Sequence, residues 1–126
     1  MADFNKQLEY WKITALSDFE TAEILIEKDK FLHGLFFCHL AIEKVLKAHF
    51  VKATKNLAPK THDLIYLAKK TDIKLDEKHK NLLTVLMRYQ LEGRYPENFP
   101  SNPDEEKLIE YLKQTKELLE WLVKQL

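Results

Sequence analysis

"FLHGLFFCHLAIEKVLKAHFVKA", residues 31–53, is the stretch that decides the fold, because it is apolar almost all the way round at helical spacing. Leu35 and Ile42 face one side of the expected helix, whereas Phe37 faces nearly the opposite side. A helix of this kind must be covered on more than one side. Because five or fewer helices can hardly enclose it, we expect part of its surface to meet a second copy of the chain.

The rest of the chain shows apolar residues at three- and four-residue spacing and holds only two glycines, so helix is the expected regular structure. The predicted elements are a helix over residues 5–29, a short helix from its cap Thr61 to about Lys70, a helix from Asp76 to its stop at Gly93, and a last helix with Asn102 as cap and Pro103 as first residue. We therefore expect an all-α fold in a single domain over residues 1–126. Its architecture would be an up-and-down helical bundle of four main helices and one short helix.

Composition narrows the class of function. Lys and Arg together number 20, and so do Asp and Glu, so the chain lacks the basic balance of an open nucleic-acid-binding surface. Any nucleotide or RNA site must therefore be local. The single cysteine, Cys38, excludes an internal disulfide and makes a reducing cytoplasm the expected compartment. No apolar run has the length of a signal peptide or a membrane span, so we expect neither secretion nor membrane insertion.

Three polar residues interrupt the apolar central segment at a spacing of four: His39, Glu43 and Lys47. This spacing places them in one strip along the helix. One interpretation is a simple ion pair between Glu43 and Lys47, together with a histidine satisfied at an interface. The other is that the strip lines a cleft, where neighbouring groups would perturb its protonation.

A second candidate site lies where the fourth main segment ends. Arg88 and Glu92 are one helical turn apart and could pair with each other. Alternatively, Arg88 and Arg94 could bind a phosphate, while Tyr95 stacks on a base. The glycine and prolines of this stretch are explained by a helix end followed by a loop, but the arginines and tyrosine are not.

The sequence offers little for other chemistries. None of the five histidines forms a pair at the spacing that puts two metal ligands on one helical face. Two isolated glycines cannot build a Gly-rich phosphate loop. We therefore expect no metal and no cofactor.

Three motifs in order, "AIEKVLKA" at residues 41–48, "THDL" at 61–64 and "RYP" at 94–96, make the chain resemble the HEPN (higher eukaryotes and prokaryotes nucleotide-binding) domain family, in its small stand-alone "RYP" branch. The resemblance covers the chain from about Leu8 to the final helix. It implies an all-helical bundle that forms a homodimer and works with a small nucleotidyltransferase in a toxin–antitoxin pair. Many members are metal-independent ribonucleases, whose active site holds an arginine followed four to six residues later by a histidine.

This chain departs from that ribonuclease pattern. Arg88 is followed by "YQLEGR" and Arg94 by "YPENFP", so neither arginine has the required histidine. We therefore favour a nucleotide- or RNA-binding homodimer, and whether it is an enzyme stays open. The alternative is a metal-independent endoribonuclease toxin with a non-standard histidine.

Each reading assigns its own residues. In the binding reading, the site residues are Arg88, Arg94, Tyr95, Glu43 and Lys47. In the ribonuclease reading, His39 or His62 would supply the acid or base.

Overall fold

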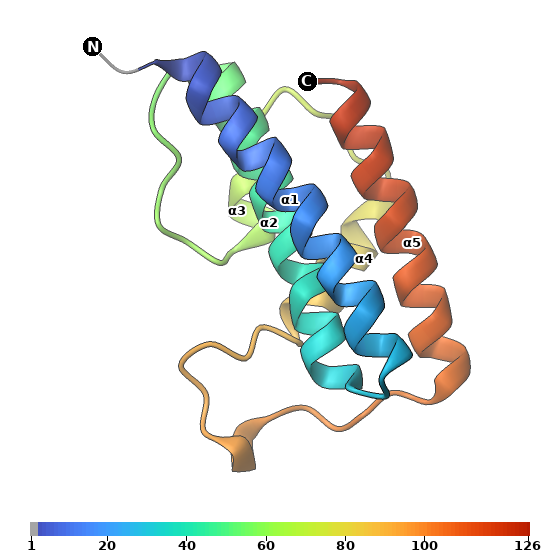
Figure 1. The fold of residues 1–126 in the computed structure, drawn as a ribbon. Coiled ribbons are helices and arrows are strands. Elements are labelled where there is room, and N and C mark those ends of the chain that lie inside the picture. The colour runs from blue at the N-terminus through green and yellow to red at the C-terminus, as the bar shows by residue number, and fades with distance from the viewer. Residues whose placement is uncertain (1–2) are drawn as a thin grey trace.

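The computed structural model describes residues 3–126, which form five α-helices and one short 3-10 helix and contain no strand. In chain order the elements are α1 (Phe4–Glu27), α2 (Phe31–Thr54), α3 (Leu64–Lys69), α4 (Glu77–Met87), the 3-10 helix η1 (Pro96–Asn98) and α5 (Glu105–Lys124). Figure 1 shows α1 and α2 running antiparallel side by side, with α5 alongside them. The prediction of an all-α bundle with four main helices and one short helix is confirmed.

Helix α2 lies at the centre of the bundle, where α1, α3, α4 and α5 all contact it. Leu35, Ile42 and Leu46 are fully buried, and Phe37 on the opposite side is partly buried. The reason given for expecting a second copy against α2 is therefore wrong, because helices of the same chain cover most of its apolar surface. The homodimer stays a prediction, without this support.

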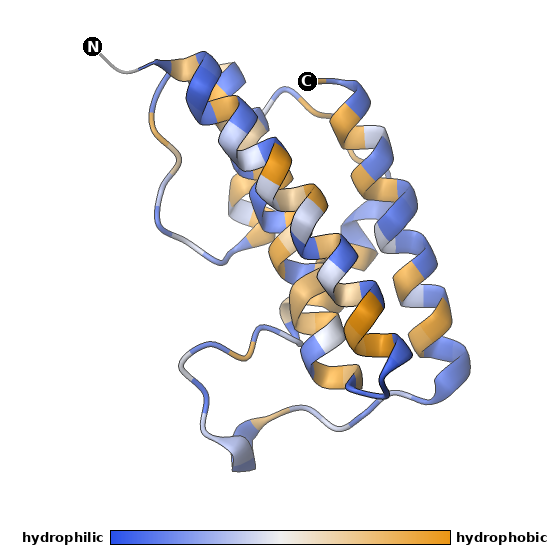
Figure 2. Ribbon diagram, viewed as in Figure 1, coloured by the Kyte–Doolittle hydropathy of each residue, from blue (hydrophilic) through white to orange (hydrophobic). Residues whose placement is uncertain are grey.

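Helix α5 has the single buried face that its sequence pattern predicts. Figure 2 shows hydrophobic and hydrophilic segments alternating along it. Leu108, Thr115 and Leu119 are buried, while Leu112 and Leu126 of the predicted stripe are partly buried. This face closes the bundle over α2.

The close approach of α1 and α2 depends on Gly34. A Cβ atom at this position would clash with Cγ1 of Ile26 and would lie 3.3 Å from the backbone oxygen of Ala22. Any larger residue would therefore require the Ile26 side chain to move and the backbone at Ala22 to give way slightly. The glycine is needed here for space, because the helical backbone at Gly34 requires no left-handed conformation.

Four α-helices begin at an aspartate whose carboxylate accepts the backbone N–H three residues further on. These caps are Asp3, Asp63, Asp76 and Asp104. The predicted helix start near Asp76 is confirmed, but the predicted caps Thr61 and Asn102 are wrong. Thr61 instead accepts the N–H of Asp63 at 3.1 Å and orders the turn before α3, and Pro103 precedes the cap of α5.

Helix α4 is shorter than predicted, because it ends at Met87 and not near Gly93. Turns replace the last helical residues, with the N–H of Tyr89 bonded to the carbonyl of Leu86 at 2.9 Å. Gly93 does adopt the expected left-handed conformation, with φ of 81°, but inside the following loop. Residues 88–95 are therefore an irregular segment, and Figure 1 shows the chain leaving the bundle from here to the start of α5.

Replacing Gly34 by alanine should lower the free energy of unfolding by about 1–3 kcal/mol, the usual cost of an overpacked site. This loss would occur even though alanine is about 1 kcal/mol better than glycine inside a helix. Urea denaturation measures the change. In an Ile26→Ala background the same substitution should cost less, and a Gly34→Ala protein as stable as the wild type would contradict the argument.

Candidate functional site

A buried carboxylate, Glu43 of α2, is the centre of a polar cluster in the apolar interior. Its side chain is 4 % exposed, and Oε1 accepts a hydrogen bond from Nδ1 of His62 at 2.7 Å. Its other oxygen, Oε2, lies 3.2 Å from Nζ of Lys47. Both oxygens are thus compensated, as a buried carboxylate requires. We refer to His39, Glu43, Lys47, His62 and Glu92 together as the Glu43 cluster.

Lys47 is buried as well, with its side chain 8 % exposed. Its ammonium group lies 5.1 Å from the centre of the Trp11 ring on α1, within the range of a cation–π interaction. The predicted pair between Glu43 and Lys47 at a spacing of four is therefore present, and a residue of the neighbouring helix adds to it. The spacing along α2 predicted the pair but gave no sign of Trp11.

His39 holds the loop that carries His62. Its Nε2 lies 3.1 Å from the backbone oxygen of His62 and must donate there, because a carbonyl can only accept. Burial lowers the pKa of His39, although the Glu43 carboxylate favours the charged ring. The ring is therefore held as the neutral Nε2–H tautomer, and its Nδ1 faces Glu43 at 4.0 Å without a hydrogen bond to any residue in 3–126.

His62 connects the buried part of the cluster to the surface. Its Nδ1 faces the buried Glu43, while Nε2 lies 3.1 Å from Oε2 of Glu92 in the segment after α4. Exposure rises along this path, from 4 % for the Glu43 side chain to 44 % for His62 and 64 % for Glu92. Sequence reasoning missed this role of Glu92, because the contact joins two loops that no local spacing relates.

Arg88 and Arg94 are the only arginines in the chain, and they lie on either side of Glu92. Both are exposed, and neither guanidinium forms an ion pair with residues 3–126. The predicted pair of Arg88 with Glu92 is wrong, because α4 ends before these residues and Glu92 contacts His62. Since two residues span at most about 7 Å, the backbone of Arg94 lies close to Glu92.

The remaining site prediction concerns Tyr95, which is 70 % exposed and stands free of the bundle. Its side chain makes no hydrogen bond within the described residues, 3–126. Neither His39 nor His62 forms a hydrogen bond with an arginine in that range. The structure thus joins four predicted residues in one cluster and leaves Arg88, Arg94 and Tyr95 beside it as a separate, exposed group.

The family model of the HEPN domain matches residues 8–126, nearly the whole chain. The chain belongs to the HEPN domain family. No curated protein and no solved structure matches it. In this HEPN domain two of the three motifs meet in space, since "AIEKVLKA" supplies Glu43 and Lys47 and "THDL" supplies His62. The third, "RYP", begins two residues after Glu92, which contacts His62.

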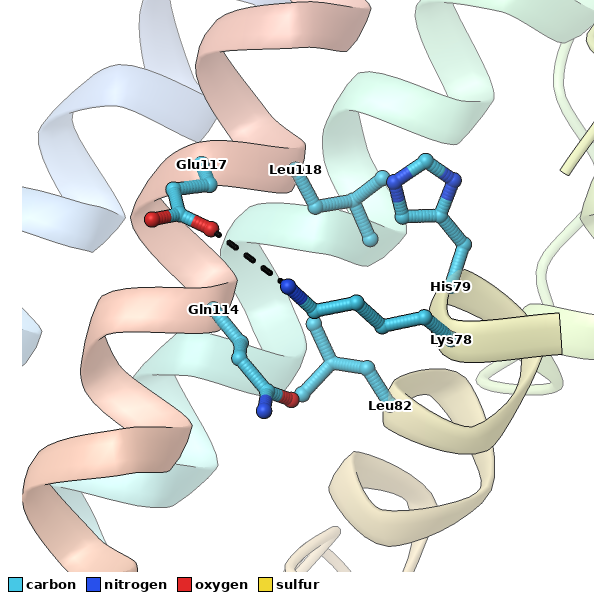
Figure 3. Close-up of a pocket in the computed structure, with 6 residues that line it drawn as sticks. All are labelled: Lys78, His79, Leu82, Gln114, Glu117 and Leu118. Carbon is cyan, nitrogen blue, oxygen red and sulfur yellow. Dashed lines mark ion pairs between the residues drawn. The ribbon is translucent and has the colours of Figure 1, made fainter. Parts of the chain in front are cut away.

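Two hollows elsewhere on this HEPN domain do not involve the Glu43 cluster. One lies between α4 and α5 and has a volume of about 30 Å³. Figure 3 shows the side chains that line it, with Lys78 pointing toward Glu117, and the two charged groups are 3.9 Å apart. A larger one of about 450 Å³ lies at α3 and α4. Its walls are apolar, and its basic residues are Lys69, Lys74 and Lys80.

Three further observations concern residues 3–126 of this HEPN domain. Residues 3–126 contain no group of three histidine, cysteine or carboxylate side chains that could hold a metal ion. No helix in that range is long and apolar enough to cross a membrane. Burial raises the pKa of Cys38 to about 12, so its thiol is not a ready nucleophile.

Acid should destabilise this HEPN domain partly through His39. Burial lowers the pKa of His39 below 6.5, so the unfolded chain binds its proton more readily than the folded one. The free energy of unfolding therefore decreases as the pH falls through and below 6.5, because the unfolded chain takes up this proton and the folded chain does not. Histidine proton NMR should therefore give a titration midpoint for His39 below 6.5, and His39→Gln should flatten the slope of unfolding free energy against pH. A midpoint at or above 6.5 would contradict the assignment.

Proposed function

We propose that this HEPN chain binds the phosphate of a nucleotide or of single-stranded RNA at the segment from Arg88 to Tyr95. The observation that carries the proposal is the pair of exposed guanidiniums on either side of Glu92, which is itself bonded to His62. Arginine offers parallel N–H donors that match a phosphate group. Because the chain has no net charge, such a local cationic group is the part of its surface suited to an anion.

Tyr95 gives this segment a second means of recognition. Its ring is 70 % exposed and lies next to Arg94 in the chain, so a base attached to a bound phosphate could stack on it. Stacking on an aromatic ring is tolerant of base identity. The proposed ligand class is therefore a nucleotide or unpaired RNA.

Glu43 and Lys47 have a positioning role in this proposal. Both are too deeply buried to touch a ligand, with side chains 4 % and 8 % exposed. Glu43 instead orients His62, and His39 holds the backbone of the same residue. The buried part of the cluster thereby sets the position of the loop whose His62 contacts Glu92.

We also propose that the chain works as a homodimer with a separate small nucleotidyltransferase, in a toxin–antitoxin-like pair, as its resemblance to minimal HEPN proteins implies. The outer face of α1 supports an interface of this kind. It carries Tyr10, Ile13 and Ile24, which are 56 %, 60 % and 52 % exposed, and exposed apolar patches mark interaction surfaces. Light scattering at micromolar concentration measures the mass directly, and a value of 15.0 kDa would contradict the dimer.

A metal-independent ribonuclease is the second candidate, and the Glu43–His62 hydrogen bond of 2.7 Å favours it. A carboxylate that holds one ring nitrogen leaves the other to act as a base, as in other carboxylate–histidine pairs. In this reading His62 takes the proton of a ribose 2′-hydroxyl, whose oxygen attacks the neighbouring phosphorus. The protonated His62 ring gives this proton to the departing 5′-oxygen as the P–O bond breaks, and a 2′,3′-cyclic phosphate remains. An arginine stabilises the charge that develops on the phosphorane.

The Arg88→Ala, Arg94→Ala double variant should bind AMP and short single-stranded RNA at least about tenfold more weakly, because a charge-assisted hydrogen bond contributes about 1.5–3 kcal/mol. Titration calorimetry at fixed salt measures the loss. The matched control is Lys113→Ala, Lys116→Ala on α5, which removes the same charge from another exposed surface. Equal affinities for the double variant and the wild type would remove the proposed site.

Ribonuclease activity predicts cleavage of single-stranded RNA in the presence of EDTA, with products that end in cyclic phosphate. His62→Gln should reduce this rate by about 10²-fold or more, the usual contribution of a general base. A His33→Gln variant, which alters an exposed histidine of α2, serves as control. If no product with a cyclic phosphate forms at high protein concentration, the ribonuclease hypothesis is wrong. The binding hypothesis is not affected by that result.

A further inference from the structure

The imidazole of His62 lies between two carboxylates in very different surroundings. On one side Nδ1 bonds to Glu43 at 2.7 Å, with the carboxylate buried to all but 4 %. On the other side Nε2 lies 3.1 Å from Glu92, whose side chain is 64 % exposed. A neutral imidazole has one N–H and could serve only one of these carboxylates, so only the charged ring donates to both.

The two contacts differ in how readily they can be given up. An exposed ion pair contributes little to stability, commonly 0–1 kcal/mol, whereas breaking a buried pair by removing one partner costs about 3–5 kcal/mol. Glu43 is also tied to Lys47, whose side chain is only 8 % exposed and so has little access to water as a substitute partner. The Glu92 side of His62 is therefore the exchangeable side.

Resting on the function proposed above, we infer that Nε2 of His62 is an anion-binding position which the Glu92 carboxylate fills in the free protein, and that the ligand's phosphate takes the place of that carboxylate. Glu92 thus acts as an internal stand-in for the ligand. In the sequence Glu92 lies between Arg88 and Arg94, and both arginines are exposed and form no ion pair with residues 3–126, so their guanidiniums are free to turn toward a phosphate bound there. A carboxylate presents two oxygens and one negative charge to the ring, while inorganic phosphate or the terminal phosphate of AMP presents more of each.

The charges around His62 support this exchange. The groups that face it are Glu43, with Lys47 behind it, and His39 on α2, together with Glu92 on the segment after α4. His39 is neutral by the argument above, so when both nitrogens of His62 donate, this ring, Glu43, Lys47 and Glu92 sum to zero. When Glu92 leaves, the remaining group carries one positive charge, which an anion would compensate.

The backbone around Glu92 is suited to such a movement. Gly93, with φ of 81°, follows it directly, and residues 92–98 are all exposed. Figure 1 shows this part of the chain standing away from the helices. Few buried contacts therefore hold Glu92 in place apart from His62 itself.

The test compares Glu92→Gln with Glu97→Gln in the full chain. Glu97 carries the same charge in the same exposed segment and forms no ion pair with residues 3–126. Calorimetric titration with inorganic phosphate, and then with AMP, should show binding to Glu92→Gln at least about fivefold tighter than to the wild type. The Glu97→Gln protein should stay within about twofold of the wild type, as surface substitutions usually do.

Long-range ¹H–¹⁵N spectra of the histidine rings give a readout that needs no nucleotide. The Nε2 signal of His62 should shift in Glu92→Gln without ligand, stay in place in Glu97→Gln, and move when phosphate is added to the wild type. Equal phosphate affinities for the two variants, or a His62 signal that phosphate leaves unmoved, would overturn the inference.

The same titrations separate this inference from the function on which it rests. If the arginine double variant loses binding while Glu92→Gln and Glu97→Gln bind equally well, the proposed function is supported. The inference that phosphate displaces Glu92 is then wrong. If Glu92→Gln binds more tightly but removing the arginines has no effect, the His62 position stands without them. If no variant binds phosphate or AMP, both fall.

Discussion

The need to compensate one buried carboxylate, that of Glu43, constrains the whole site. A lone charge in the middle of α2 would be very costly in an apolar interior. Lys47 satisfies one oxygen from the next turn of the same helix, but the other needs a donor from elsewhere, and His62 provides it. The loop between α2 and α3 is thereby drawn onto α2, where His39 also bonds to its backbone.

This constraint links the interior of the bundle to its surface. Polar side chains form one path, from Lys47 through Glu43 and His62 to Glu92, and exposure rises from Glu43 outward. The outer end of the path lies in the segment that holds both arginines of the chain. A protein without net charge can bind an anion only where such a local arrangement exists, so the buried pair and the proposed ligand site belong to one electrostatic system.

Several predictions from the sequence identified the right feature but gave it the wrong boundary, residue or size. Periodicity identified the helices, but α4 ends at Met87 because turn hydrogen bonds replace the helical pattern before Gly93. Aspartates cap α3 and α5 where Thr61 and Asn102 were expected, since each aspartate stands directly before its helix and reaches the third N–H. The apolar surface of α2 was judged too large for one chain to cover, yet the other four α-helices cover most of it.

The sequence by itself determined the helical bundle and the strip of His39, Glu43 and Lys47, because both follow from spacing along one helix. The periodicity of a helix predicts contacts between residues three or four positions apart, but it predicts no contact with residues outside that helix. Only the tertiary structure decided that His62 and Glu92 complete this strip, since Glu43 and His62 are 19 positions apart and Glu92 lies beyond two more helices. The cause of that assembly is the low polarity of the interior, which makes a distant partner for a buried charge energetically necessary.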